Sequence, residues 1–152
     1  MRFSQKDNSL LIEYGSAVVM ITPWGADSLR VRMTRENKMD EHNWALTVER
    51  WHSEEEIKKH SQSSMEASIT NGKITAKVSF EGWISFYNDK GELLTEEYWR
   101  NRNRIDRYSV PIRVEGRELK PIPGTNDYSL AARFEAFDDE HIYGMGQYQD
   151  KS

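Results

Sequence analysis

Two acidic clusters are the residues of this sequence whose type could support catalysis. They are Asp138-Asp139-Glu140 and Glu54-Glu55-Glu56. Hydrolysis by a pair of carboxyl groups needs them about 5 Å apart across a bound substrate, and neighbours in sequence seldom converge in that way. Both clusters lie in polar, turn-like stretches that would not raise a carboxyl pKa into the range of an acid catalyst. We therefore interpret them as solvated charge and predict no catalytic residue.

Three residues at a spacing of four could hold a metal ion. His52, Glu56 and His60 would share one face of a helix, because positions i, i+4 and i+8 drift by only about 40° per step. A zinc site also needs a defined second shell around its ligands. The charged surroundings favour an exposed helix face instead, so the sequence predicts neither a metal site nor a cofactor.

A dense basic run could bind phosphate groups. It consists of Arg100, Arg102, Arg104 and Arg107, separated by Asn101, Asn103 and Asp106. Release of counterions would drive such binding, but Glu96 and Glu97 lie just upstream and the formal net charge of the chain is -4. We favour an edge or connecting loop with internal ion pairs, and we predict no nucleic-acid partner.

Tryptophan side chains offer a further binding chemistry. The chain has five of them, and aromatic faces can stack on sugar rings, although they equally supply core area in β-proteins. Trp44 and Trp51 lie in a charged stretch and are the better candidates for exposed sugar contact. Trp83 alternates with Ser85 and Tyr87 in a strand-like pattern and could face either way.

The final segment contains two glycines one residue apart. Tyr143-Gly144-Met145-Gly146-Gln147 lacks the Gly-x-Gly-x-x-Gly spacing of dinucleotide sites. Glycines in a strand mark a bulge or the close approach of another backbone. We interpret Tyr143 to Gln147, together with Gln149, as a segment that docks against a partner domain. The alternative is an ordinary terminal strand with a bulge.

Length and composition limit the kind of domain that carries these residues. A chain of 152 residues fits one compact domain and can bury roughly two-thirds of its unfolded surface. The chain has no cysteine, so disulfides and thiolate metal sites are excluded. No apolar run approaches the length of a membrane span or the core of a signal peptide. We expect a single soluble, cytoplasmic domain over residues 1–152, with no membrane partner.

A period of two recurs along the chain and predicts β-strands. Ser9 to Tyr14 and Ala17 to Thr22 form an expected hairpin, and Leu29 to Thr34 an expected half-buried strand. Asn71-Gly72 predicts a tight two-residue turn, because both residues tolerate positive φ. Further strands are expected at 83–87, 92–95, 108–114, 118–122 and 127–137.

Many short strands about ten residues apart indicate an all-β fold built as an antiparallel β-sandwich. A charged excursion from 36 to 62 interrupts the pattern. Within it, Ser53 followed by three glutamates could cap a helix. We therefore expect at most one short helix, near residues 53–61.

Several motifs match a known family in their order and spacing. They are Ile21-Thr22-Pro23-Trp24-Gly25 with Leu29-Arg30-Val31-Arg32, the turn at Asn71-Gly72, Gly82 to Asn88 with Gly91 to Leu94, and Arg133-Phe134-Glu135 with Asp139 to Gln147. Together they resemble the N-terminal β-sandwich of glycoside hydrolase family 31, a galactose-mutarotase-like supersandwich. The form Gly-Met-Gly-Gln-x-Gln is most similar to the α-xylosidase-like branch. The resemblance runs from about Tyr14 to Gln149 and leaves the 36–62 excursion unmatched.

The resemblance implies a retaining α-glycosidase, a glycosyl hydrolase of carbohydrate metabolism whose β-sandwich precedes a catalytic (β/α)8 barrel. A barrel needs roughly 250 residues, and the Trp-x-Asp-Met-Asn segment of the family's nucleophile does not occur in the sequence. We therefore expect the barrel to be absent, residues 140–152 to lead towards it, and the fragment to be inactive.

The roles that the resemblance implies are packing on the barrel, shaping the sugar-binding mouth through residues 143–147 and Gln149, and supporting homo-oligomer contacts. The alternatives are a stand-alone carbohydrate-binding module and a protein-interaction domain.

Overall fold

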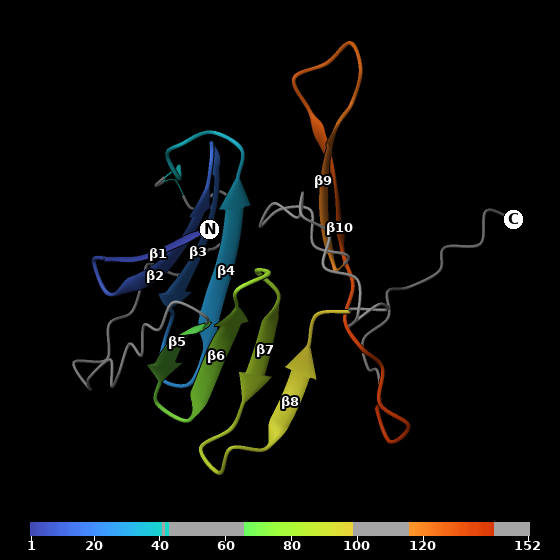
Figure 1. Ribbon diagram of the computed structural model, residues 1–152. Coiled ribbons are helices and arrows are strands. Elements are labelled where there is room, and N and C mark those ends of the chain that lie inside the picture. The colour runs from blue at the N-terminus through green and yellow to red at the C-terminus, as the bar shows by residue number, and fades with distance from the viewer. Residues whose placement is uncertain (41, 43–65, 99–115, 142–152) are drawn as a thin grey trace, which may run out of the picture.

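The computed structural model describes residues 1–40, 42, 66–98 and 116–141. Its strands are β1 (Arg2–Lys6), β2 (Ser9–Tyr14), β3 (Ala17–Pro23), β4 (Leu29–Thr34), β5 (Glu66–Asn71), β6 (Ile74–Ser79), β7 (Ile84–Tyr87), β8 (Leu93–Glu96), β9 (Arg117–Pro121) and β10 (Tyr128–Ala132). In the described residues they form two four-stranded antiparallel sheets and one two-stranded hairpin (Figure 1). Within this part of the chain, no helix is long and apolar enough to cross a membrane.

The first sheet, in the order β1-β2-β3-β4, is a meander closed by tight turns. Tyr14 pairs with Ala17 across Gly15-Ser16, which confirms the hairpin predicted there. The sequence did not predict β1. Lys6 pairs with Ser9, and the two turn residues Asp7 and Asn8 have φ of 44° and 65°. Two left-handed residues match the twist of a hairpin, and aspartate and asparagine tolerate that region better than other residues with a Cβ.

The second sheet, in the order β5-β6-β7-β8, contains the predicted turn at Asn71-Gly72, but displaced by one residue. Asn71 pairs with Ile74, so the two turn residues are Gly72 and Lys73. Asn71 is buried, and its side-chain Nδ2 donates to the carbonyls of Gly25 and Ser28 at 2.8 and 2.7 Å. The asparagine therefore ties this turn to the loop between β3 and β4.

The core lies between the two four-stranded sheets, where alternate residues of β2, β3, β5 and β6 point inward. Its fully buried members contribute about 1.5–3 kcal/mol each relative to exposure, and they give the sandwich its rigidity. The largest apolar ones are Ile12, Val19, Ile21, Ile69, Val78 and Ile84, all 0–1% exposed. This arrangement confirms the all-β antiparallel sandwich that the sequence predicted.

The third element is the hairpin of β9 and β10, which stands beside the sandwich with its turn projecting past it (Figure 1). Its register runs from Pro121 opposite Tyr128 to Arg117 opposite Ala132. Both strands fall within the predicted ranges 118–122 and 127–137 apart from Arg117, and β10 is shorter than predicted. Beyond β10 the chain continues through Phe134, which forms an isolated bridge with Glu97.

Several predictions fall outside the described residues. These are the helix near 53–61, most of the 36–62 excursion, the strand at 108–114, and nearly all of the segment 140–152. They stay predictions, as does the single-domain organisation of residues 1–152.

Candidate functional site

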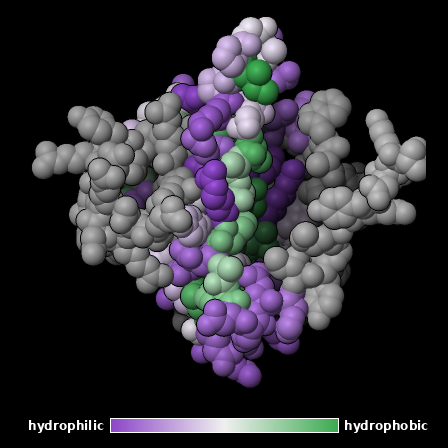
Figure 2. Space-filling model, turned by 90° about the vertical axis from the view of Figure 1, so that its right-hand side faces the viewer, coloured by the Kyte–Doolittle hydropathy of each residue, from purple (hydrophilic) through white to green (hydrophobic). Residues whose placement is uncertain are grey.

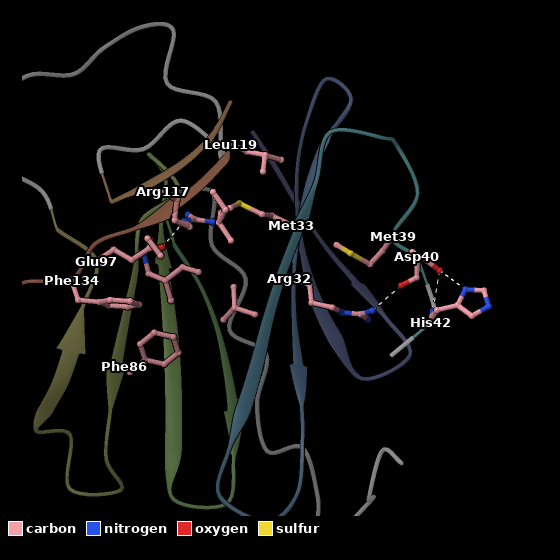
Figure 3. Close-up of a pocket in the computed structure, with 14 residues that line it drawn as sticks. Arg32, Met33, Met39, Asp40, His42, Phe86, Glu97, Arg117, Leu119 and Phe134 are labelled. Atoms are coloured by element: carbon pink, nitrogen blue, oxygen red, sulfur yellow. Dashed lines mark hydrogen bonds and ion pairs between the residues drawn. The ribbon is translucent and has the colours of Figure 1, made fainter. Parts of the chain in front are cut away.

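A hollow of about 470 Å³ opens where the β9–β10 hairpin faces the sandwich, and we refer to it as the hairpin groove. Apolar side chains from β4, β7, β9 and β10 and the residues after β10 supply most of its lining. Among them are Val31, Met33, Phe86, Leu119, Leu130 and Phe134. Figure 3 shows Met33 on the same side of β4 as Phe86, Arg117 and Phe134, while Arg32 points to the other side. The groove is thus mainly apolar, with charged groups at defined places.

Backbone hydrogen bonds attach the hairpin to the second sheet. The N–H of Tyr98 donates to the carbonyl of Arg133 at 2.9 Å, while within the hairpin the N–H of Arg133 donates to the carbonyl of Gly116 at 2.7 Å. The N–H of Glu135 donates to Glu96 at 2.9 Å. Gly116 is required at this junction, because an added Cβ would lie 2.9 Å from the Cβ of Glu97. The residues directly after β8 and the start of β9 therefore approach closely.

At this junction Glu97 and Arg117 form a buried ion pair. Each side chain is 5% exposed, and Nε of Arg117 lies 2.5 Å from Oε1 of Glu97. Oε2 of Glu97 accepts the N–H of Ile84 at 2.8 Å, and Nη2 of Arg117 donates to the carbonyl of Gly82. Nη1 of Arg117 is buried and has no hydrogen-bond partner in the described part of the chain. The pair joins β7, the end of β8 and β9. It leaves Nη1 of Arg117 beside the groove as a donor that is not used by the pair.

The environment of the pair shifts both pKa values away from the charged forms. Burial raises the pKa of Glu97 above 4.5, and the charge of Arg117 and the N–H of Ile84 oppose that shift. Burial also lowers the pKa of Arg117 below the ordinary value of a guanidinium, against the attraction of Glu97. Because both oxygens of Glu97 are already engaged, the carboxyl group is held as a structural partner and is not presented to a substrate.

The free energy of unfolding should depend on pH through the protonation of Glu97. A carboxyl pKa that is raised by folding means that the folded state holds the proton more tightly, so stability falls as pH rises from about 4.5 through the raised value. Urea unfolding across this range should show the wild type losing stability relative to the apolar double variant Glu97→Leu/Arg117→Met. Parallel pH profiles of the two proteins would contradict this prediction.

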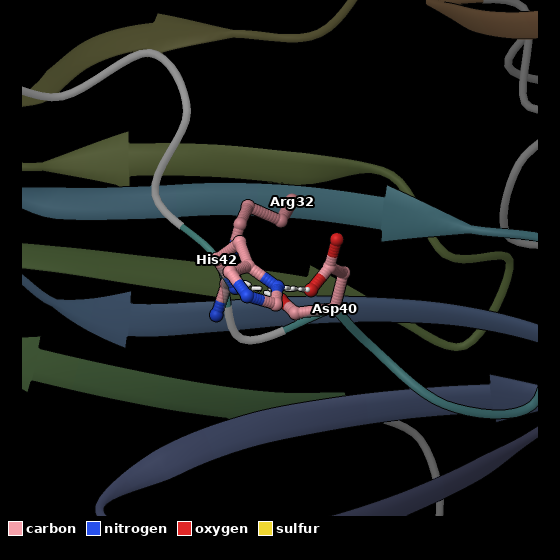
Figure 4. Close-up of polar contacts among 3 residues, drawn as sticks. All are labelled: Arg32, Asp40 and His42. Carbon is pink, nitrogen blue, oxygen red and sulfur yellow. Dashed lines mark hydrogen bonds and ion pairs between the residues drawn. The ribbon is translucent and has the colours of Figure 1, made fainter.

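A second polar cluster lies at the rim, on the other side of β4 (Figure 4). Nη1 of Arg32 donates to the backbone carbonyl of Asp40 at 2.8 Å. Oδ1 of Asp40 accepts the backbone N–H of His42 at 3.0 Å and lies 2.8 Å from its Nδ1. The side chains of Asp40 and His42 are 66% and 73% exposed. This is a local turn in water, which orders the chain after β4 and offers no enclosed reaction site.

A second hollow, of about 400 Å³, lies over the outer face of the first sheet. Its lining includes Trp24, and the guanidinium of Arg30 lies over the Trp24 ring at 4.8 Å from the ring centroid. Trp24 is the only tryptophan among the described residues that line this hollow, and the cation covers one face of its ring. That leaves less of the ring for stacking on a sugar.

The side of the molecule that carries the hairpin shows an apolar stripe between hydrophilic flanks (Figure 2). Large hydrophobic residues of this part of the chain are open to solvent. They are Ile122 (42% exposed), Tyr128 (47%), Leu130 (62%), Phe134 (51%) and Phe137 (38%). Large exposed apolar patches are a common feature of surfaces that contact another molecule.

The predicted site residues are distributed unevenly over the described part of the chain. Tyr143, Gly144, Met145, Gly146, Gln147 and Gln149, and the candidate sugar contacts Trp44 and Trp51, all lie outside it. Asp138, Asp139 and Glu140 are exposed, in agreement with solvated charge. In the described residues no group of three histidine, aspartate or glutamate side chains could hold a metal ion.

Sequence reasoning missed the Glu97–Arg117 pair. Glu96 and Glu97 were noted only as neighbours of the basic run at 100–107, where surface ion pairs were expected. The available signal was Gly116, a glycine directly before a strand, since an isolated glycine at such a place marks a close backbone approach.

Three comparisons relate this chain to known proteins. The family described as "Glycosyl hydrolase 31 N-terminal galactose mutarotase-like domain" matches residues 18–151. An uncharacterized family 31 glucosidase, ORF2, of Pseudescherichia vulneris is 37% identical over 158 aligned residues, which cover 93% of this chain and 29% of that protein. The crystal structure of a family 31 α-xylosidase from a soil metagenome, complexed with xylose, matches with a TM-score of 0.81 at 41% identity, over 98% of this chain and 22% of that one. The chain thus spans less than a third of the length of these relatives.

Proposed function

Because the chain belongs to glycosyl hydrolase family 31, through its N-terminal galactose mutarotase-like domain, we propose that it is the non-catalytic N-terminal domain of a cytoplasmic, α-xylosidase-like α-glycosidase. In this role it packs on a catalytic (β/α)8 barrel and helps to shape the mouth of the sugar-binding site. The chemistry resides in the barrel, and this domain supplies a rigid wall.

The observation that carries the proposal is the apolar surface of the hairpin side. A protein with a well-filled sandwich core has no need to expose Leu130 and Phe134 at 62% and 51%. Such exposure is expected where a second domain covers the surface in the intact protein. The buried carboxyl group of Glu97 is engaged by Arg117 and by the N–H of Ile84, and so is not presented to a substrate.

A grafting experiment tests the proposal. In the soil-metagenome α-xylosidase, the segment that this chain matches would be replaced by this chain, which is 41% identical to it. We expect the chimera to be soluble and to hydrolyse an aryl α-xyloside within about tenfold of the parent enzyme, because a residual misfit of about 1.4 kcal/mol corresponds to that factor. The isolated chain should give no turnover.

Two controls make the outcome decisive. The parent enzyme, expressed in parallel, shows that the assay works, and the parent lacking the matched segment shows that the graft is needed. A soluble chimera without turnover beside an active parent would refute the proposal. Sustained turnover by the purified 152-residue chain would refute its non-catalytic part.

A further inference from the structure

We propose that the hairpin groove is the docking site for an extended segment of polypeptide from the rest of a family 31 chain, which inserts apolar side chains and gives a backbone carbonyl to Nη1 of Arg117. The inference rests on the proposed function and deepens it. It assigns the contact to residues of the groove, whereas the sequence assigned docking to residues 143–147 and Gln149.

The shape and lining of the groove fit an inserted segment. Its volume of about 470 Å³ is large enough for several side chains. One wall comes from the sandwich, with Met33 and Phe86, and the other from the hairpin side, with Leu130 and Phe134. A two-stranded hairpin is marginally stable alone, so an occupant that contacts both walls would stabilise its position.

The charge of the groove selects the chemistry of the occupant. The guanidinium of Arg117 is already matched by the carboxylate of Glu97 at 2.5 Å, so Arg117 offers no uncompensated charge to an anionic ligand. On this guanidinium the buried donor Nη1 remains, and it has no acceptor among the described residues. A buried donor left unpaired costs about 1–3 kcal/mol. A neutral acceptor surrounded by apolar groups is the complementary partner.

Polypeptide in an extended conformation provides this combination. It carries a carbonyl at each residue, and alternate side chains point to opposite faces, so one face can enter a groove between two walls. The relatives contain polypeptide that could be this occupant, since more than three-quarters of the soil-metagenome α-xylosidase lies outside the part that matches this chain. Docking of a second copy, or of a small apolar molecule, is distinguished by the experiment below.

A single introduced cysteine can report on the groove, because the chain has none of its own. Leu130→Cys places the thiol on the groove wall at a residue 62% exposed in this structure. Leu94→Cys is the matched control, at a residue of β8 that is 49% exposed and is not part of the described groove lining. Maleimide modification would be followed by peptide mass spectrometry in the isolated chain and in the grafted α-xylosidase.

The expected result is a fall of at least tenfold in the modification rate of Leu130→Cys on going from the isolated chain to the active chimera. Leu94→Cys should change by less than threefold. An unchanged rate at Leu130→Cys in a chimera that hydrolyses xyloside would overturn the inference and leave the proposed function intact. A chimera without turnover would refute the proposed function, and the inference with it.

The dependence of the modification rate on protein concentration distinguishes the other possible occupants of the groove. Protection of Leu130→Cys in the isolated chain that increases with protein concentration would identify a second copy as the occupant and overturn the inference. Protection in the isolated chain that is independent of concentration would show that the groove is already filled, which also overturns it. The complementary variant Arg117→Lys removes Nη1 and keeps the charge, and in the chimera it should weaken protection of Leu130→Cys.

Discussion

Replacing Arg117 with methionine is expected to destabilise the fold by about 3–5 kcal/mol, because it removes one partner of a buried ion pair and leaves the other uncompensated. Glu97 is 5% exposed and would keep only the N–H of Ile84 as a hydrogen-bond partner. The same change also cuts the bond from Nη2 to the carbonyl of Gly82, which connects β9 to the loop before β7. Urea unfolding followed by tryptophan fluorescence would measure the loss.

The double variant Glu97→Leu/Arg117→Met separates charge from packing. Apolar residues of similar volume often replace a buried ion pair without loss, because the cost of dehydrating both charges disappears. We expect the double variant to recover most of the stability that Arg117→Met loses. Arg2→Met is the surface control: Arg2 lies 3.9 Å from Glu13 with its side chain 80% exposed, and should cost less than about 1 kcal/mol.

Equal losses in Arg117→Met and in the double variant would contradict this account. That result would mean that the side-chain volume at the junction, and not the uncompensated charge, holds the hairpin to the second sheet.

The regular part of the fold could be predicted from the sequence, because local patterns determine it. Val19 and Ile21 alternate with partly buried Met20 along β3, and both are 0% exposed, as a period of two requires. The hairpin at Gly15-Ser16 followed from turn chemistry alone. The Asp7–Asn8 turn and β1 were missed, because Asp-Asn is a weaker turn signal than Asn-Gly and the strand before it is polar.

The groove could not be predicted, because its parts come from distant segments. Arg117 opens a strand and would be taken as exposed by any rule based on residue type. Its burial follows from the approach of Gly116 to Glu97 and of the guanidinium to Gly82, contacts separated by 19 and 35 residues. Leu130 and Phe134 have even spacing typical of a strand face, but the sequence does not say that this face is left open.

The turn at Gly72 carries the second large expected effect, since Gly72→Ala should destabilise the protein by about 3 kcal/mol. Two terms contribute. The φ of Gly72 is 57°, a left-handed conformation that costs a residue with a Cβ about 1–2 kcal/mol. An added Cβ would also lie 2.5 Å from the carbonyl oxygen of Ala26 and would collide with Oδ1 of Asp27, and forced overpacking costs about 1–3 kcal/mol.

The collision matters because this turn connects the two sheets. Oδ1 of Asp27 accepts the N–H of Lys73 at 2.8 Å, and the buried Nδ2 of Asn71 bonds to the carbonyls of Gly25 and Ser28. Moving the turn away from the 25–28 loop to make room for a methyl group would lengthen all three bonds. A shift of the turn would therefore weaken these hydrogen bonds, so it cannot relieve the steric strain in Gly72→Ala without a loss of stability.

Gly15→Ala isolates the backbone term, because Gly15 has a φ of 60° but no atom within 4 Å of an added Cβ. It should cost only about 1–2 kcal/mol, measured as the shift of the urea midpoint at unchanged slope. The difference between the two alanine variants is then the contribution of the inter-sheet contact at Gly72. Equal losses at Gly15 and Gly72 would show that the 25–28 loop yields freely, and that the junction of the two sheets depends on the apolar core alone.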